Sequence, residues 1–487
     1  VRGAGLGAVV AYPLAPGARA AVVLGEDAPR RGRSLPPRLL LEACRLLLDA
    51  LRGVPDFVWA LLLTNVLGVS PITGVAAIAV SVAGILGKVL SEQWDAVPAG
   101  RYRALRTTGA GRLATFAYGI QPLAARTTLS FLLMRAECAV RNASVIGVVG
   151  GGGLGAGLWD EYTDGDWPGV ATVLLTLLAV TASGDLLANL LRRRLRVDPN
   201  HPRASRARDP RATTRRRLQV AAAALSLATA CALWLADDLA RVASELARVE
   251  WDFVEPYTLG LFRPDLSWPT LADVARAAVV PLGIGLLATV LGAALAALSS
   301  YPASVAFQLD APRFTGERPG AGERALRLMA LLVARAAALV ARGVPEVAWL
   351  VVLAVVLRAG TAPCVLAIAL HTAGVLHRVF TEAVDDVRYQ DLERVDAGAS
   401  RAQRFLFGAL PRVRPVWRAY ASFQFEVNVR AGITLGLVGA GGLGHLFEVN
   451  LAFREHGRAA AFLWGMVLLT VVIDRASRWL EARRLSC

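Results

Sequence analysis

A long internal repeat constrains this chain of 487 residues more than any other feature. Residues 137–155, ECAVRNASVIGVVGGGGLG, return as EVNVRAGITLGLVGAGGLG at 426–444, with ten identities at an offset of 289. RGVPD at 52–56 returns as RGVPE at 342–346, at an offset of 290. A period this long exceeds that of a solenoid unit. The repeat therefore predicts two tandem copies of a whole domain.

Hydropathy indicates where such a chain would fold. Hydrophobic residues make up 55% of it and the mean hydropathy is +0.48, with several apolar runs near the roughly 20 residues that span a bilayer. We predict an all-α polytopic membrane protein. The expected spans are 54–69, 73–90, 125–149 and 169–191 in the first copy, and 218–236, 275–298, 345–357, 364–380, 416–438 and 459–473 in the second. The arginine-containing apolar segments 39–51 and 325–340 are expected to continue into the spans that follow RGVP.

The charge distribution predicts the topology and the boundary between the copies. The net charge is +15, but eleven arginines lie in residues 192–217 alone, which argues for a cytoplasmic linker rather than a nucleic-acid surface. Loop 101–126 has five arginines and no acid, whereas 160–166 has four acids and no base. Basic loops stay in the cytoplasm. We therefore expect a first module at 1–191, a cytoplasmic linker at 192–217 and a second module at 218–487, and no nucleic-acid partner.

The first copy is shorter at its start than the second. Tyr12 and Pro13 correspond to Tyr301 and Pro302, yet two apolar spans precede the latter pair and only a short segment precedes the former. Either the start lies upstream of Val1 or this half lacks its opening helices. The first module is thus expected to be N-terminally incomplete.

Several chemistries find no support in the sequence. The five cysteines show no CxxC or Cys/His spacing, so neither a disulfide framework nor a metal site is predicted. A phosphate-binding loop needs GxxxxGK followed by Ser or Thr, and the single lysine, Lys88, is followed by Val89. We predict that the chain is not an enzyme, carries no cofactor and cannot hydrolyse ATP by that route.

The repeated stretch has its own physical character. Each copy places a glutamate four residues before an arginine inside an apolar run, a spacing that brings the two side chains to one face of a helix. A glycine cluster follows, which indicates a helix that breaks where protein or a cavity shields it. The residues concerned are Glu137, Arg141, Glu426, Asn428 and Arg430, and the glycines Gly150, Gly151, Gly152, Gly153, Gly155, Gly439, Gly441, Gly442 and Gly444.

The second copy resembles the permease subunit of phosphonate-type ABC importers. FEVNVRAGITLGLVGAGGLG, preceded by GAS and FGALP, carries the resemblance, and the first copy is similar to a more diverged member. The resemblance implies two type I importer permease modules fused in one chain. It also implies two partner ABC ATPase subunits that bind ATP and Mg²⁺, and an extracytoplasmic substrate-binding protein.

The resemblance further identifies a cytoplasmic loop that docks into the ATPase. In the family, EAA is followed by three residues and then a glycine, and a proline comes thirteen residues after the glycine. The Gly–Pro spacing occurs twice here, whereas Arg103 and Leu392 replace the glutamate, with Glu393 adjacent to the second. The glycine would permit a turn between two short helices and the proline would start the next. An ordinary basic loop is the alternative for these residues, Gly109, Ala110, Pro122, Gly398, Ala399 and Pro411.

The motifs also have less specific interpretations. The glycine clusters match a dinucleotide fingerprint, but that fingerprint needs a short strand before it, and a run of transmembrane length precedes both copies. The Glu–Arg pairs could attract an anion along the translocation path, although bracing between helices is the favoured interpretation because charges in a membrane generally find partners. His371, which stands where the first copy has Ser81, is expected to be a hydrogen-bonded packing residue.

The predicted function is that of a transmembrane permease for phosphonate, phosphite or a related oxyanion, with alternating access powered by separate ATPase subunits. A permease for methionine or another small solute is the alternative within the same class. An ion-coupled secondary transporter with parallel repeats and a membrane scaffold built on a degenerate permease are the alternatives from other classes.

Overall fold

The structure is a computed structural model that describes residues 35–98, 100–147, 152–195, 222, 225–226, 229–247, 257, 259–309, 320–358, 360–387 and 399–485. Every regular element in these ranges is helical. The chain divides into two units, one of residues 1–163 and 180–256 and the other of 164–179 and 257–487. Each unit is described by itself below.

The first half of the chain contains α3 (Leu35–Gly53), α4 (Asp56–Leu67), α5 (Pro71–Asp95), α6 (Gly100–Thr107), α7 (Arg112–Ala114), the π-helical turn η3 (Thr115–Ile120), α8 (Gln121–Ile146), α9 (Gly153–Asp164) and α10 (Trp167–Leu195). They are followed by α12 (Ala236–Ala247), which packs against α4 and α5. In the first unit α5 packs against α3, α4 and α8.

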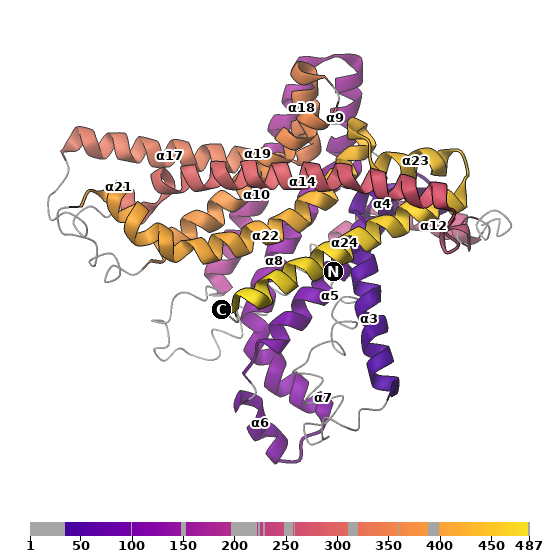
Figure 1. Cartoon of the computed structure of the whole chain (residues 1–487), viewed down its shortest axis with the longest axis horizontal. Helices are drawn as coiled ribbons and strands as arrows, with labels where there is room; N and C mark the ends of the chain where they lie inside the picture. The colour runs from indigo at the N-terminus through magenta and orange to yellow at the C-terminus, as the bar shows by residue number, and fades with distance from the viewer. Residues whose placement is uncertain are drawn as a thin grey trace. The chain divides into compact units, whose positions relative to one another are not determined.

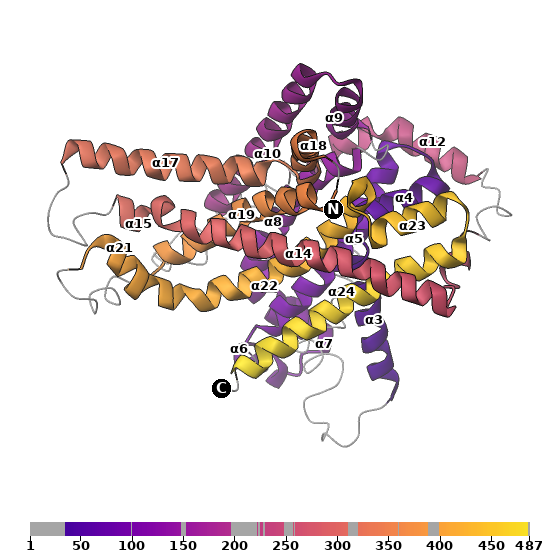
Figure 2. The same ribbon diagram turned by 45° about the horizontal axis from the view of Figure 1, so that its top comes forward.

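The second unit repeats this order after one additional long helix. It contains α14 (Trp268–Ala303), α15 (Val305–Gln308), α17 (Ala321–Gly343), α18 (Glu346–Leu357), α19 (Thr361–Asp385), α21 (Arg401–Gln403), the π turn η6 (Arg404–Ala409), α22 (Leu410–Leu435), the π turn η7 (Gly436–Ala440), α23 (Leu443–Ala452) and α24 (His456–Leu485). Figures 1 and 2 show α14, α17, α19 and α22 running side by side.

Small residues allow the helices of the second unit to approach closely. A Cβ atom at Gly292 of α14 would overlap the side chain of Thr372, and one at Gly374 of α19 would lie 2.5 Å from the backbone nitrogen of Arg342. Glycine at such contacts is typical of helix packing in membranes, where shape complementarity rather than water exclusion drives association. Phe307, Phe380 and Phe405 lie in the core at the end of this bundle.

The RGVP motif bends the chain sharply. α17 and α18 meet at an angle of 97°, so residues 325–340 do not continue directly into the following span as expected. The cause is local: proline excludes the helical conformation from the residue before it, and Val344 is extended with ψ 126°. An indole closes each bend, because Trp349 Nε1 donates to Ala341 O at 3.1 Å and Trp59 Nε1 donates to Leu51 O at 3.2 Å.

Five described helices are long and apolar enough to cross a membrane, namely α5, residues 167–184 of α10, α14, α19 and residues 456–477 of α24. The bent α17–α18 pair would make a sixth. The expected spans 125–149 and 416–438 fall largely on α8 and α22, which carry several charges and are not among these helices. The expected span 54–69 is the shorter apolar helix α4, and eight of the nineteen residues of the expected span 218–236 lie outside the described residues. The fold is that of an all-α polytopic membrane protein.

Candidate functional site

The glycine cluster of the second copy turns the chain. Gly439 within η7 and Gly441 and Gly442 after it have φ of +125°, +76° and +83°, a region that favours glycine because it lacks a Cβ. The turn is also tightly closed, since a Cβ at Gly444 would overlap the carbonyl oxygen of Ile433. The long helix therefore ends where the sequence predicts a break, and α23 leaves in a new direction.

The first copy makes a comparable turn. Gly152 and Gly153 both have φ of +74°, and a Cβ at Gly147 would lie 2.5 Å from the carbonyl oxygen of Gly152 and 3.0 Å from the Cα of Gly155. Gly150 and Gly151 lie outside the described residues. A break between helices is thus common to both units.

The two Glu–Arg pairs form as their spacing predicts. Arg430 Nη2 lies 3.4 Å from Glu426 Oε1 in α22, and Arg141 Nη2 lies 3.6 Å from Glu137 Oε1 in α8. All four side chains are largely buried, with exposed fractions of 8% for Glu426 and 14% for Arg430. Charges removed from water in this way are costly unless paired, so each glutamate stabilises its arginine.

Asn428 belongs to a different set of contacts from the pair beside it. Its Oδ1 accepts from Thr372 Oγ1 at 2.9 Å and from Gln424 Nε2 at 3.1 Å. Its Nδ2 donates to Thr289 Oγ1 at 2.9 Å. The amide is 1% exposed and joins α22 to α14 and α19, so it fastens three helices together at the centre of the second unit.

The acid that ends the RGVPD and RGVPE motifs was not among the predicted site residues. Asp56 accepts a hydrogen bond from Ser81 Oγ of α5 and one from Asn142 Nδ2 of α8, the latter at 2.6 Å. Glu346 Oε1 lies 3.3 Å from Nε2 of His371, whose Nδ1 lies 3.2 Å from the carbonyl oxygen of Val344. His371 is therefore a hydrogen-bonded packing residue. The sequence signal was the acid shared by the two copies of the motif.

The predicted ATPase-docking loop precedes each long helix. In the first unit, α6 ends at Thr107, Gly109 turns the chain with φ +82°, and a new helix begins at Arg112 after Ala110. In the second unit Gly398 lies outside the described residues and Ala399 precedes Ser400. Ser400 caps the next helix in a capping box with Gln403, which satisfies backbone donors at both residues.

The prolines of this loop lie at the second positions of the long helices α8 and α22, where the sequence predicts that a helix starts. A short helix that begins at Arg112 or Arg401 and a π turn lead directly into each of them. Gln121 N–H donates to Phe116 O, a spacing of five residues instead of four. Proline lacks an N–H, so it interrupts the helix least beside a turn that has already shifted the hydrogen-bond pattern.

The helices α8 and α22 connect these features without bringing them together. The π turn and its proline lie at one end, the Glu–Arg pair lies in the second half, and the glycine turn lies at the other end. A helix of 26 residues spans about 39 Å, so the loop and the glycine turn lie far apart at the two ends of one helix.

Two repeated bundles, each with a basic loop, a long helix holding a buried ion pair and a glycine turn, define a polytopic membrane transport component. Residues 32–197 and 331–486 each match the family described as binding-protein-dependent transport system inner membrane component. The chain belongs to this family, and it is a multi-pass permease of the bacterial inner membrane that works with ATPase and binding-protein partners.

Several relatives carry names of phosphorus oxyanion transport. The phosphate-import permease protein PhnE of Mycolicibacterium smegmatis is 28% identical over 456 residues, which cover 93% of this chain and 80% of the relative. The putative phosphite transport system permease protein HtxC of Stutzerimonas stutzeri is 32% identical over 32% of this chain and 56% of its own length. The putative cryptic phosphonate transport system permease protein PhnE2 of Escherichia coli is 37% identical over 22% of this chain and 88% of its own length. No solved structure matches the chain at a significant level.

Proposed function

We propose that the chain imports a phosphorus oxyanion, namely phosphonate, phosphite, phosphate or a related ion, through alternating access powered by two ATPase subunits. The observation that carries this proposal is the double occurrence of one mechanical unit, in which a helix joins a basic loop to a buried Glu–Arg pair and a glycine turn. The names of the relatives support the choice of substrate class.

In this proposal each ATPase subunit contacts one basic loop. The loop residues are Gly109 and Ala110 in the first unit and Gly398 and Ala399 in the second. ATP and Mg²⁺ bind the ATPase subunits, and this chain contributes the membrane helices that change position. Because α8 and α22 run unbroken from the π turn to the glycine turn, a displacement at the loop tilts the helix as one body and reaches the buried pair.

An extracytoplasmic binding protein would deliver the substrate to the opposite side. A guanidinium recognises tetrahedral oxyanions well, because its donors match pairs of anionic oxygens. Arg141 and Arg430 are the candidates for this role, and their glutamates would neutralise them when no anion is present.

Reconstitution tests the function directly. The chain, its partner ATPase and its binding protein would be placed in proteoliposomes, and uptake of radiolabelled phosphite, phosphate and methylphosphonate would be compared with uptake of sulfate and methionine. We expect uptake that requires ATP and selects a phosphorus oxyanion. Methionine uptake would favour the alternative permease, and uptake driven by an ion gradient without ATP would overturn the ABC mechanism.

Crosslinking tests the docking loops. Ala110→Cys and Ala399→Cys should each crosslink to a cysteine in the ATPase cleft, whereas a cysteine at Asp265, outside these loops, should not. Failure at both loops in a complex whose assembly is verified would remove the coupling role from them.

A further inference from the structure

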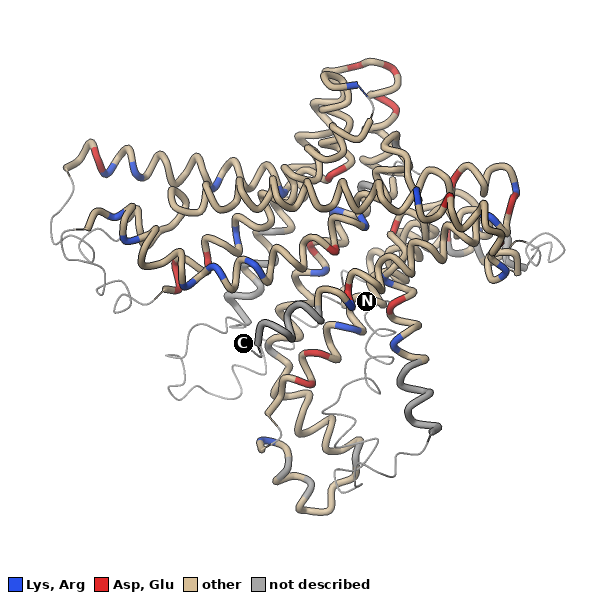
Figure 3. The backbone as a smooth tube through the Cα atoms, viewed as in Figure 1, with Lys and Arg blue, Asp and Glu red and all other residues tan. Residues whose placement is uncertain are grey.

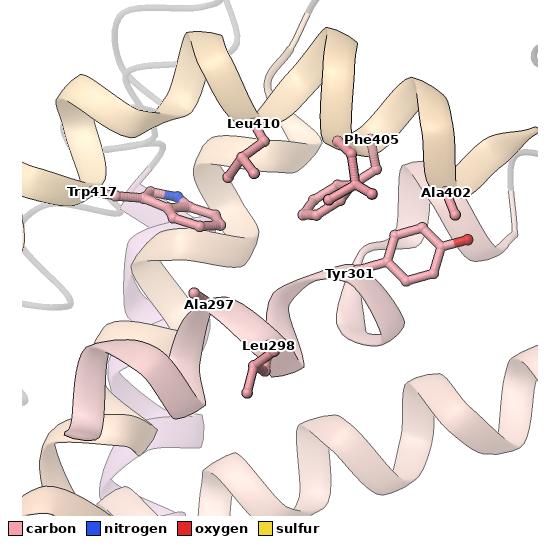
Figure 4. Close-up of a pocket in the computed structure, with 8 residues that line it drawn as sticks. Ala297, Leu298, Tyr301, Ala402, Phe405, Leu410 and Trp417 are labelled. Atoms are coloured by element: carbon pink, nitrogen blue, oxygen red, sulfur yellow. The ribbon is translucent and has the colours of Figure 1, made fainter. Parts of the chain in front are cut away.

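The second unit contains an apolar cavity of about 290 Å³ beside the π turn η6. Figure 4 shows Phe405, Leu410 and Trp417 reaching from one helical segment toward Ala297 and Leu298 of α14. Its full lining is Ala297, Leu298, Tyr301, Ala402, Phe405, Leu406, Leu410 and Trp417. Ala402, Phe405 and Leu406 lie within the predicted docking loop, but the function proposed above assigns no role to the cavity itself.

The aromatic walls of this cavity are fixed by contacts outside it. Trp417 stacks on Phe380 with ring centroids 4.4 Å apart, and its indole N–H donates to Phe380 O at 3.3 Å. Tyr301 packs against Phe405 at 5.1 Å. Because the indole N–H of Trp417 already donates to Phe380 O, Trp417 presents only apolar ring atoms to the cavity.

A basic surface borders the cavity. Residues 399–425 contain five arginines and no acid, and Figure 3 shows positive residues along α21 and the first half of α22. Arg414 follows the lining residue Leu410 by four positions and Arg418 follows Arg414 by four, so they share a face of α22. Both are exposed, and among the described residues neither forms an ion pair.

Topology places the cavity at the cytoplasmic edge of the bilayer. α14 is a candidate span that ends at Ala303, and basic segments such as 399–418 stay on the cytoplasmic side. Tyr301 and Trp417 have the amphipathic rings that are enriched at this depth. Leu298 is 76% exposed at the mouth, so the cavity opens toward an apolar environment.

The first copy has other residues at several of these positions. At an offset of 289, Gln121 stands for Leu410, Ala125 for Arg414, Thr128 for Trp417 and Leu129 for Arg418. The hydroxyl of Thr128 donates to Gln93 Oε1 at 3.1 Å, in place of the Trp417–Phe380 stack. The tryptophan of the cavity wall and both arginines are therefore replaced together in the first copy, which favours their belonging to one combined site.

We propose that this site binds an anionic phospholipid of the inner leaflet, with an acyl chain in the cavity and the phosphate on Arg414 and Arg418. Basic clusters at the cytoplasmic ends of membrane helices attract anionic lipid headgroups. An apolar side chain of the partner ATPase is the competing occupant. The lipid is favoured because the arginines have no described acidic partner and the mouth is apolar.

Native mass spectrometry of the full complex, released from nanodiscs that contain phosphatidylglycerol and phosphatidylcholine, tests the proposal. The wild type should retain phosphatidylglycerol preferentially. Arg414→Ala with Arg418→Ala should weaken that retention by about fivefold for each arginine removed. Ala297→Trp should fill the cavity and lower retention while both arginines remain.

Two measurements keep the test decisive. Arg276→Ala, at the opposite end of α14 and 82% exposed, should leave retention unchanged, and thermal unfolding in phosphatidylcholine should show that every variant is folded. Equal retention of both lipids by the wild type would overturn the proposal, as would unchanged retention in the folded cavity and arginine variants. A crosslink from Leu406→Cys to the ATPase that displaces the lipid would assign the cavity to the ATPase instead.

Discussion

The two units share their breaks and differ in the contacts that hold their long helices. Both have an RGVP bend closed by a tryptophan, a π turn, a buried Glu–Arg pair and a glycine turn. In the first unit, Asn142 joins α8 to Asp56 of α4. In the second, Asn428 joins α22 to Thr289 of α14 and Thr372 of α19.

The difference shows that the two permease modules keep the positions of their helix breaks but differ in the side-chain contacts between helices. Backbone breaks set the directions of the helices and are reproduced at the same positions. Side-chain contacts need only satisfy buried polar groups, and different pairs can do so. Asn428 corresponds to Ala139 and Thr372 to Val82, so the first unit cannot form the same hydrogen bonds at these two positions.

The largest effect is expected at the Glu–Arg pairs, where the two units should behave alike if the pairs are braces. Arg430→Ala or Arg141→Ala leaves a buried glutamate unpaired and should cost about 3–5 kcal/mol of unfolding free energy. Thermal and denaturant unfolding of the purified chain measures it.

A double-mutant cycle then separates bracing from substrate contact. Glu426→Gln with Arg430→Gln should recover assembly and uptake if the pair is a brace, and Glu137→Gln with Arg141→Gln is the matched test in the first unit. Assembly and ATP hydrolysis with poor uptake, in one double mutant only, would assign the substrate role to that unit. Full uptake by both would sink the substrate-path hypothesis.

The next effect concerns the amides that differ between the units. Asn428→Ala leaves buried hydroxyl and amide groups without partners and should cost about 1–3 kcal/mol. Asn142→Ala, which leaves Asp56 with Ser81 alone, should cost a similar amount. Unfolding measurements on the two variants compare the two units, and an effect in only one would mean that the other amide is dispensable.

A smaller loss of unfolding free energy is expected from substitutions at the two RGVP bends, and it should be the same in both units. Trp59→Phe and Trp349→Phe each remove one indole donor from a backbone carbonyl and should each cost about 1 kcal/mol. Trp268→Phe, at a side chain that is 81% exposed and lies away from the bends, is the control. Unequal costs for the two bends would contradict their equivalence.

The smallest effect on stability is expected from Asp265, which lies just before α14. The helix α14 has no described counterpart in the first unit. The hydroxyl of Thr270, followed by the N–H and hydroxyl of Ser267, lowers the pKa of Asp265 below its ordinary value. Because the folded-state pKa is depressed, the stabilisation is present above the unfolded-state pKa and is lost as the pH falls through the folded-state value.

Asp265→Asn should therefore flatten the acidic limb of a plot of thermal midpoint against pH. Asp273→Asn, which removes a carboxylate paired only with the exposed Arg276, is the matched control. An unchanged acidic limb in Asp265→Asn would show that these hydrogen bonds do not contribute.

Sequence reasoning succeeded where the cause is local. The i, i+4 spacing placed Glu426 beside Arg430, and the glycine cluster located the end of α22, because both follow from helix geometry and backbone freedom. The repeat and its hydropathy were sufficient to predict the polytopic helical class.

Distant contacts and angles could not be obtained in this way. Asn142 and Asp56 are 86 positions apart, and their hydrogen bond depends on how α4 packs against α8. The proline at 345 marks a break, but the 97° angle depends on the packing of α17 and α18 against α19. The π turns have no local signature, since the shifted hydrogen bonds depend on where the whole helix is held.

The π turns also record an order of events in the history of the chain. A π turn accommodates one residue more than the α-helical pattern allows, and here it occupies 115–120 and 404–409, positions that correspond at an offset of 289. The change of offset from 290 to 289 falls earlier, between α5 and η3 in one copy and between α19 and η6 in the other. The matching positions indicate that the extra residue of the π turn is older than the duplication and that the length difference is younger. Both halves share the same interruption of the helix next to the predicted docking loop.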